Sequence, residues 1–358
     1  MTADTVGGVW QYATDLAAAL VSRGDRVTIA VMGPSPDATQ ARNAAEGGCA
    51  LVDTGLPLDW LADGQQPVVD AAGLIARLAA EADVDLVHCN SPALVGAARW
   101  PAPVVAVAHS CIATWWQAAR SEPLDPAFDW HRQMTRDGLL AADAVVVPSA
   151  GYAAAVQRTY ALPALPLVVH NGRAIEAQVR TADTDLAPFA LTVGRLWDEV
   201  KGAAMLDRVA ARIDLPFVAA GSTRAPHGGT ITLHHLRHEG ALPRSQLDAL
   251  LQQRPIFVSA ASFEPFGLAV LEAAAAGCAL VLSDIPTFRE LWDGAATFVS
   301  PDDEAGFAAA ITALAAMPEQ RRSLGDAAAE RARRYTPDRM AAEMQAIYNR
   351  LQTRSVAA

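Results

Sequence analysis

Short, continuously apolar segments recur along this chain, and stretches with helical periodicity separate most of them. Continuous apolarity is typical of strands buried on both faces, as in parallel sheets that helices cover. The alternation therefore predicts an α/β fold with parallel sheets. The expected strands lie at residues 26–31, 86–89, 104–108, 144–147, 167–169, 189–193, 217–220, 256–259, 279–282 and 297–299.

A polar stretch at residues 173–188 lacks apolar periodicity and is expected to link two domains. The chain has 358 residues, which is enough for two domains of ordinary size. We predict a first domain at residues 1–172 and a second at residues 173–336. Residues 337–358 form a C-terminal segment, in which a helical pattern begins at once.

Composition excludes several classes of protein. The net charge of −11 argues against a nucleic-acid partner, and no basic cluster alternates with aromatic residues. The four cysteines are scattered, which is typical of reduced thiols in a cytoplasmic protein. The apolar stretch at residues 268–282 is interrupted and too short to span a membrane, and the N-terminus does not resemble a signal peptide. We expect a cytoplasmic protein without a transmembrane segment.

Lys201 is the only lysine, since 27 of the 28 basic residues are arginine. It lies six residues after Arg195, beyond the expected strand at residues 189–193. In open parallel sheets, ligands bind beyond the carboxyl ends of the strands. A guanidinium can hold two oxygens and an ammonium supplies a compact charge, so the two residues suit a diphosphate. The alternative is a lone surface lysine.

A second segment, residues 262–272, leads from an expected strand into an apolar helix and carries Glu264 and Glu272. Pro265 fixes the backbone before the helix, and Gly267 lets a ligand approach the main chain. The free amides at the start of the helix then form an anion site. Carboxylates accept hydrogen bonds from hydroxyls, so the segment suits a diphosphate flanked by sugars. The alternative is two ordinary helix glutamates.

Two Asp-x-Asp pairs, Asp83 with Asp85 and Asp183 with Asp185, could in principle hold a metal ion. The first pair precedes a strand, at the end of the sheet away from ligands, and the second lies in the linker. Arg195, the lysine and the helix end already supply positive charge. We therefore expect neither a metal site nor a cofactor.

Two further elements, Gly7-Gly8-Val9 and Asn171-Gly172, precede the Gly-Arg-Leu … Lys-Gly segment of residues 194–202 and the glutamate pair. These four elements occur in the order found in the retaining glycosyltransferases of family 4, also called group 1, and the chain resembles this family over nearly its whole length. The resemblance implies a GT-B fold, in which two Rossmann-like domains face a cleft. It also implies a first domain that binds the acceptor, a second that binds a nucleotide-sugar donor, and a C-terminal helix that crosses back.

The resemblance assigns roles within the donor site. Arg195 and Lys201 are expected to bind the diphosphate. Glu264 is expected to bind hydroxyls of the donor sugar, and Glu272 the ribose. Backbone contacts to the donor are expected from Gly7, Gly8, Phe266, Gly267 and Leu268.

His109 follows the apolar run at residues 104–108, so it lies at the carboxyl end of an expected strand. The resemblance implies that this histidine lies near the donor sugar, where its ring or its backbone carbonyl helps to stabilise the transition state. From the residues alone, an ordinary strand-end histidine is the alternative. The expected catalytic residues are His109, Arg195, Lys201 and Glu264.

Three tryptophans, Trp10, Trp115 and Trp116, are candidates for stacking against a sugar-like or cyclic polyol acceptor, and core positions are the equal alternative. Acidic residues offset the arginines of residues 112–140, which favours a soluble acceptor over a lipid.

One feature departs from the family pattern. The Gly7-Gly8 element should follow a first central strand, yet the residues before it, Thr2 to Thr5, are poor strand formers. We therefore expect this strand to be missing, with the natural chain beginning further upstream.

The expected function is the transfer of a hexose-type sugar, with retention of configuration and without a metal, from a nucleoside-diphosphate sugar to a hydroxyl of a small or soluble acceptor. Uridine diphosphate (UDP) is the expected nucleotide. The alternatives are a non-catalytic nucleotide-sugar-binding protein, for which the missing strand is the best support, and a glycoside phosphorylase on the same scaffold.

Overall fold

The computed structural model describes residues 1–174, 186, 188–226 and 228–356. For residues 354–356 it describes the backbone only. Most of the expected linker lies outside this part of the chain, as do Asp183 and Asp185. The chain divides into two compact units. Unit 1 combines Met1–Ala174 with the C-terminal segment from Tyr335, and unit 2 is Ile175–Arg334.

Unit 1 contains two parallel sheets, with the strand orders β1-β2-β3 and β4-β5-β6-β7. The strands are β1 (Thr2–Asp4), β2 (Thr28–Met32), β3 (Ala50–Asp53), β4 (Val87–Cys89), β5 (Val104–Val107), β6 (Ala144–Val147) and β7 (Leu167–Val168). The helices are α1 (Gly8–Ser22), α2 (Ala38–Glu46), α3 (Gln65–Glu81), α4 (Pro92–Val95), α5 (Ile112–Ala119), α6 (Asp129–Ala141), α7 (Ala150–Tyr160) and α14 (Pro337–Val356).

The expectation that the first strand is missing is wrong. Residues Thr2–Asp4 form β1, which pairs in parallel with β2, so that Thr2 lies opposite Ala30. The carbonyl of Met1 extends the pairing by accepting a 2.8 Å hydrogen bond from the Ala30 amide. Composition concealed this strand because it is short and polar, whereas burial of Thr2 and Ala3 against the rest of the unit makes it a strand.

The other edge of β1 is bonded through a side chain. Asn90 directly follows β4, and its amide nitrogen Nδ2 donates to the Thr2 carbonyl at 2.6 Å. Its backbone N–H donates to the Thr2 hydroxyl at 2.9 Å. Among the described strands, no ladder joins the two sheets of unit 1. The hydrogen bonds from Asn90 to Thr2 therefore connect the two sheets.

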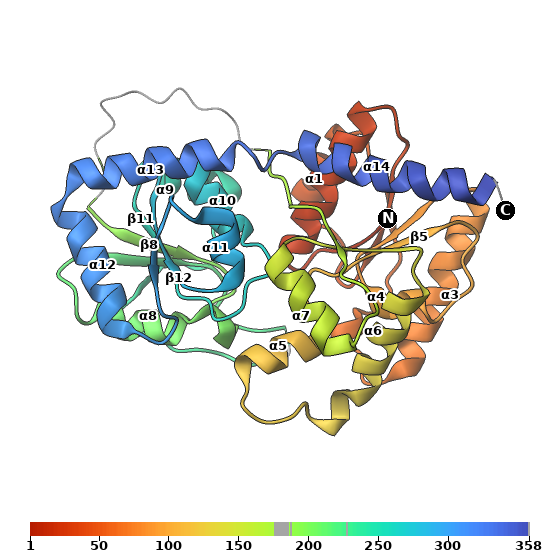
Figure 1. The fold of residues 1–358 in the computed structure, drawn as a ribbon, viewed down its shortest axis with the longest axis horizontal. Coiled ribbons are helices and arrows are strands. Elements are labelled where there is room, and N and C mark those ends of the chain that lie inside the picture. The colour runs from red at the N-terminus through yellow and green to blue at the C-terminus, as the bar shows by residue number, and fades with distance from the viewer. Residues whose placement is uncertain (175–185, 187, 227, 357–358) are drawn as a thin grey trace. The chain divides into compact units, whose positions relative to one another are not determined.

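Helix α14 belongs to unit 1 and lies beside α1 (Figure 1). Its apolar residues, among them Met340, Met344 and Ile347, share a core with Leu16 and Leu20 of α1. Burial of this stripe stabilises α14, because most of the stability of a helix in a protein comes from the packing of its apolar face.

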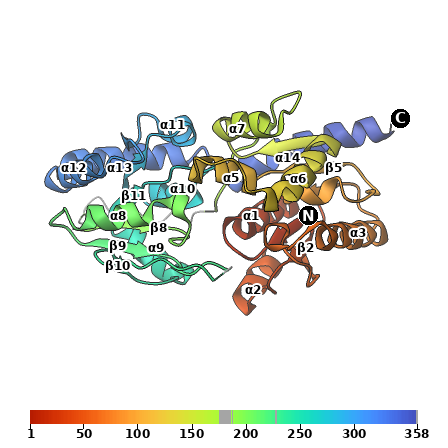
Figure 2. The same ribbon diagram turned by 90° about the horizontal axis from the view of Figure 1, so that it is seen from below.

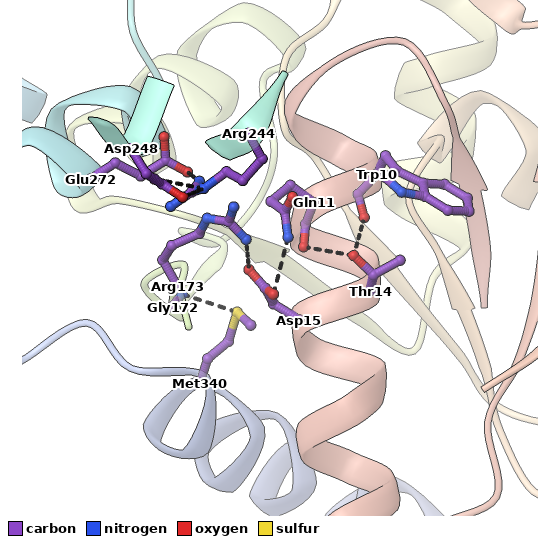
Figure 3. Close-up of polar contacts among 10 residues, drawn as sticks. All are labelled: Trp10, Gln11, Thr14, Asp15, Gly172, Arg173, Arg244, Asp248, Glu272 and Met340. Atoms are coloured by element: carbon purple, nitrogen blue, oxygen red, sulfur yellow. Dashed lines mark hydrogen bonds and ion pairs between the residues drawn. The ribbon is translucent and has the colours of Figure 1, made fainter. Parts of the chain in front are cut away.

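The Asn171-Gly172 element meets the start of α14. A side chain at Gly172 would place its Cβ 2.1 Å from the carbonyl oxygen of Thr336, so only glycine fits there. The neighbouring Arg173 is buried and forms a 2.8 Å ion pair with Asp15 of α1 (Figure 3). This motif therefore has a packing reason within unit 1.

Unit 2 contains one parallel sheet with the strand order β10-β9-β8-β11-β12-β13. Figure 2 shows β10 and β9 at its lower edge. The strands are β8 (Ala190–Val193), β9 (Phe217–Ala220), β10 (Arg237–His238), β11 (Ile256–Ser259), β12 (Ala279–Ser283) and β13 (Thr297–Val299). The helices are α8 (Ala203–Ala210), α9 (Arg244–Gln252), α10 (Leu268–Ala275), α11 (Pro286–Trp292), α12 (Glu304–Ala316) and α13 (Pro318–Ala332).

Buried strands carry the core of unit 2, since Ile256, Val258 and Val281 have no exposed surface. This complete burial is what produced the continuous apolar runs in the sequence. None of the described helices combines the length and apolarity needed to cross a membrane.

Candidate functional site

Lys201 and Glu264 meet at the carboxyl ends of β8 and β11, which are neighbours in the unit 2 sheet. The Lys201 Nζ lies 2.7 Å from the Glu264 Oε2, and about four fifths of each side chain is covered. A backbone hydrogen bond joins the segment after β8 to the segment after β11, because the Ser262 amide donates to the Val200 carbonyl at 2.9 Å. An ion pair that keeps some access to solvent can exchange partners with an anionic ligand.

Gly202 explains how Lys201 reaches this position. Its φ of 72° lies in the left-handed region, and a Cβ there would lie 2.6 Å from the carbonyl of Ala260. Any larger residue would push the two segments apart. The Lys-Gly spacing in the sequence is therefore a geometric requirement of the ion pair.

Arg195 is held by groups next to it in the chain. Its guanidinium forms a 3.0 Å ion pair with the buried Asp198 and lies 5.6 Å from the centre of the Trp197 ring. The Arg195 side chain remains 42% exposed. Asp198 was not identified from the sequence, although the i, i+3 spacing is a recognisable signal. This aspartate orients the arginine and leaves part of its fork open to a ligand.

Helix α10 begins at Leu268 and is preceded by Gly267, which has a φ of 91°. No side chain caps this end of the helix. The side chain of Phe266 is buried in the core, so this side chain is not accessible to a ligand. Uncapped N–H groups and the helix dipole make such an end attractive to anions.

Glu272 lies on α10 and forms an ion pair with Arg244, at the start of α9 (Figure 3). Arg244 also pairs with Asp248 at 2.8 Å. Burial by itself would lower the pKa of Arg244, but the charge of Glu272 and the bonds to Asp248 outweigh it and raise the pKa. The Glu272 side chain is only 10% exposed, so Arg244 compensates a largely buried charge.

Arg244 was missed in the sequence. Its spacing from Asp248 predicts a helix pair, but nothing in the sequence links it to a glutamate 28 residues later. The contact arises because α9 precedes β11 and α10 follows it, so that the fold brings the start of α9 close to α10.

Gly7 and Gly8 lie at the start of α1, where the chain leaves β1. Gly7 has a φ of 108°, and an added Cβ there would meet no atom within 4 Å. No side chain caps α1 at this end. The Asp4 side chain shapes the turn by accepting a 2.8 Å hydrogen bond from the Val6 amide. The glycine is thus required by backbone conformation, and the space beside it is open.

His109 follows β5 and is half-buried. Its Nε2 lies 2.8 Å from Oδ1 of Asn90, and the ring of Tyr12 packs against the imidazole with 4.3 Å between centres. Burial lowers the pKa of His109 to about 3, so the ring is neutral at physiological pH.

The three tryptophans differ in burial. Trp10 is 7% exposed and belongs to the core cluster that α1 shares with α14, which agrees with the core alternative. Its backbone carbonyl accepts a hydrogen bond from Thr14 (Figure 3). Trp115 and Trp116 on α5 are half-buried, and the guanidinium carbon of Arg120 lies 5.4 and 5.7 Å from their ring centres. These two rings remain candidates for acceptor contacts.

Asp83 and Asp85 precede β4, at the amino end of that strand and away from the residues just described. Within the described part of the chain, no group of three or more potential ligands from His, Cys, Asp and Glu lies close enough to hold a metal ion.

The folds of several solved structures are similar to this one. Sucrose-phosphate synthase from Thermosynechococcus elongatus aligns with a TM-score of 0.77 at 18% identity, over 95% of this chain and 92% of that chain. Anabaena HepE in complex with UDP-glucose aligns with a TM-score of 0.73 at 16% identity, over 98% of this chain and 100% of that chain. These likenesses identify the fold as GT-B.

Sequence comparison adds a more local match. A stretch of 84 residues is 43% identical to the glycogen synthase of Mycobacterium tuberculosis. It covers 23% of this chain and 20% of that enzyme, so the match spans about a fifth of the length of this relative.

Family models cover most of the chain. The model of Glycosyltransferase Family 4 matches residues 6–176, within unit 1 apart from its last two residues. The model of Glycosyl transferases group 1 matches residues 185–331, all within unit 2. The chain belongs to the family 4, group 1 glycosyltransferases.

Proposed function

We propose that this protein transfers a hexose-type sugar from a nucleoside-diphosphate sugar, with UDP as the nucleotide, to a hydroxyl of a small or soluble acceptor. The observation that carries the proposal is the pairing of Lys201 with Glu264 at 2.7 Å. A cation and a carboxylate side by side match a ligand in which a phosphate adjoins a hydroxyl-bearing sugar.

The diphosphate has three sources of positive charge in unit 2. Lys201 supplies an ammonium, Arg195 an open guanidinium fork, and α10 an uncapped N-terminus. Cleavage of the anomeric bond leaves negative charge on the diphosphate, and fixed positive groups lower the barrier by stabilising it. We propose that these groups do so without a metal ion.

We propose that Glu264 and Glu272 lie on either side of this anion site. In the proposal, Glu264 accepts hydrogen bonds from hydroxyls of the donor sugar, and Glu272 from the ribose. Their present partners, Lys201 and Arg244, prevent uncompensated buried charge before the donor binds.

Retention of configuration is part of the proposal. The acceptor hydroxyl attacks the anomeric carbon from the face that the diphosphate leaves, and a diphosphate oxygen takes the hydroxyl proton. The bond from the anomeric carbon to the diphosphate breaks as the bond to the acceptor oxygen forms. His109 would contact the donor sugar, as family membership suggests, and Trp115 with Trp116 would contact the acceptor.

The non-catalytic alternative has lost its main support, because β1 is present and paired. The phosphorylase alternative has no observation in its favour. Product analysis separates the three, since transfer, donor hydrolysis alone and phosphate-dependent cleavage give different products.

Calorimetric titration with UDP, GDP and ADP tests the donor site, on the wild type and on Lys201→Ala. We expect one nucleotide to bind clearly more tightly than the others, and its affinity to fall about ten-fold or more in the variant, which is ~1.4 kcal/mol. Arg208→Ala is the matched control, because it removes a cation that pairs with Glu304 on the surface of unit 2. Equal effects of the two substitutions, or no binding of any nucleotide, would contradict the proposal.

The stereochemical part needs its own measurement. NMR of the product, formed from an α-linked donor and a panel of sugar and polyol acceptors, should show an α linkage. A β-linked product would refute retention while leaving the donor site intact.

A further inference from the structure

A chain of hydrogen bonds in unit 1 runs from α14 to His109 through Asn90. The orientation of the Asn90 amide follows from its contact with β1. Its Nδ2 lies 2.6 Å from the Thr2 carbonyl oxygen, which can only accept a hydrogen bond. The nitrogen must therefore face Thr2, and Oδ1 must face the histidines.

Oδ1 of Asn90 lies 3.0 Å from Nε2 of His88 and 2.8 Å from Nε2 of His109. An amide oxygen has two lone pairs and no proton, so both imidazoles must donate to it. Each histidine therefore carries its proton on Nε2, and in a neutral ring the other nitrogen, Nδ1, is an acceptor.

The two Nδ1 atoms have different surroundings. That of His88 lies 2.7 Å from the hydroxyl of Tyr348 on α14, which then donates to it. The Nδ1 atom of His109 makes no hydrogen bond to any other residue in the described part of the chain, and this histidine is half-buried. The Tyr12 ring, packed against the imidazole at 63°, restricts its rotation.

We propose that Asn90 is a positioning residue that fixes His109 as the Nε2–H tautomer and thereby presents Nδ1 as a hydrogen-bond acceptor to a hydroxyl of the bound sugar. The identity of the ligand rests on the proposed function, whereas the tautomer follows from the bonds within unit 1 alone. The arrangement selects for a ligand group that donates. A hydroxyl can donate to Nδ1, whereas a carboxylate or a phosphate oxygen without a proton cannot.

Nitrogen NMR of the full-length protein, with ¹⁵N in the imidazole rings, tests the tautomer directly. The chain has eight histidines, and His88→Gln and His109→Gln assign the two signals. We expect the wild-type His109 at pH 7.5 to show a protonated Nε2 and an unprotonated Nδ1. A protonated Nδ1 in the wild type would overturn the proposal, whether or not any variant folds.

Two variants separate positioning from general support of the fold. Asn90→Leu removes the acceptor with little change in volume, so His109 should lose its fixed tautomer and show protonation at both ring nitrogens on average. Tyr348→Phe removes a hydroxyl from the same chain of bonds but leaves the contact between Asn90 and His109 in place. It should leave the His109 signals unchanged, and an equal change in both variants would contradict the role of Asn90.

Kinetics then test the use of Nδ1. Asn90→Leu should lower kcat/KM for transfer about three- to ten-fold, the worth of one neutral hydrogen bond. The affinity of Asn90→Leu for UDP, which unit 2 would bind, should stay within about two-fold of the wild-type affinity. A wild type that shows the expected tautomer but transfers no sugar would refute the proposed function and leave the tautomer standing. Normal transfer in Asn90→Leu would refute the use of Nδ1 by the ligand.

Discussion

The two units place different kinds of polar groups at the carboxyl ends of their parallel strands. In unit 2 the groups are charged and meet in ion pairs, Lys201 with Glu264 and Arg244 with Glu272. In unit 1 they are uncharged and meet in hydrogen bonds, with Asn90 between His88 and His109. The same strand architecture therefore supports two kinds of chemistry.

The difference is one of electrostatic cost. Ion pairs can accept an anion by exchanging partners, so unit 2 suits a ligand that brings charge. A neutral network is destabilised by a buried charge but can bind a hydroxyl at little cost, so unit 1 suits an uncharged group. Three predictions test this contrast, beginning with the largest expected effect.

Glu264→Gln should separate sugar recognition from nucleotide binding. We expect the rate of transfer to fall about 100-fold or more, because a ligand of the reacting sugar acts most strongly in the transition state. Affinity for UDP, which carries no sugar, should change less than about three-fold. Steady-state kinetics and calorimetry measure the two quantities.

Glu304→Gln is the control for Glu264→Gln, since it removes a carboxylate that pairs with Arg208 and Arg212 elsewhere in unit 2. If UDP affinity in Glu264→Gln falls as far as the rate, Glu264 acts mainly by orienting Lys201, and the proposed contact to the sugar is wrong.

Acid should weaken unit 1 through its neutral histidines. Burial, and then the nearby positive N-terminus, lowers the pKa of His88 to about 3, whereas an unfolded histidine titrates near its ordinary value of 6.5. The unfolded state thus binds a proton that the folded state does not, so stability is complete above pH 6.5 and falls as the pH drops from 6.5 towards 3. For His88 alone, the loss between pH 7.5 and 5 is about 2 kcal/mol.

Hydrogen exchange at the β5 amides, measured at pH 7.5, 6 and 5 after correction for intrinsic exchange rates, reports this loss for unit 1. In His88→Gln the decline over this range should be smaller, because glutamine does not titrate. Tyr12, Tyr348 and Cys89 also lie near His88, but burial raises the pKa of each, so all three stay neutral in acid. An unchanged slope in His88→Gln would show that other groups govern the acid response.

Arg244 and Glu272 should act as one element of unit 2. Each of Arg244→Ala and Glu272→Gln is expected to weaken UDP binding about three- to ten-fold, as one charge-assisted contact to the ribose is lost or misplaced. The double variant should bind UDP only slightly more weakly than either single variant, because the two residues share a role. A nucleotide without the ribose 2′ and 3′ hydroxyls should bind all four proteins about equally.

Arg237→Ala provides the matched control for Arg244→Ala, since Arg237 pairs with Glu239 on the surface of the same unit. Fully additive effects in the double variant would mean that Arg244 contacts the nucleotide independently of Glu272.

Prediction of strands from the sequence succeeded for segments in which no residue is exposed. The expected ranges 144–147, 217–220, 256–259 and 297–299 agree with β6, β9, β11 and β13. The missed strands, β1, β3 and β10, all lie at sheet edges. β3 and β10 have exposed residues, and β1 is buried but short and polar. A strand defined mainly by its neighbour leaves little trace in composition.

Local motifs likewise identified the charged residues of unit 2 but not the groups that orient them. Lys201 and Glu264 were singled out by residue type and context, and in the fold their side chains form an ion pair at 2.7 Å. Asn90 carried no signal, because an asparagine after a strand has many ordinary explanations. Its importance depends on Thr2 and His109, which are distant in sequence.

By itself, the sequence determined the α/β class and the central strands, because continuous apolar runs depend on local chemistry. Only the tertiary structure decided that Arg244 compensates Glu272, that Asn90 joins two sheets, and that Asn90 also contacts His109. Each of these depends on which segments the fold brings within hydrogen-bonding distance, and a contact between distant residues leaves no periodic pattern in a single sequence.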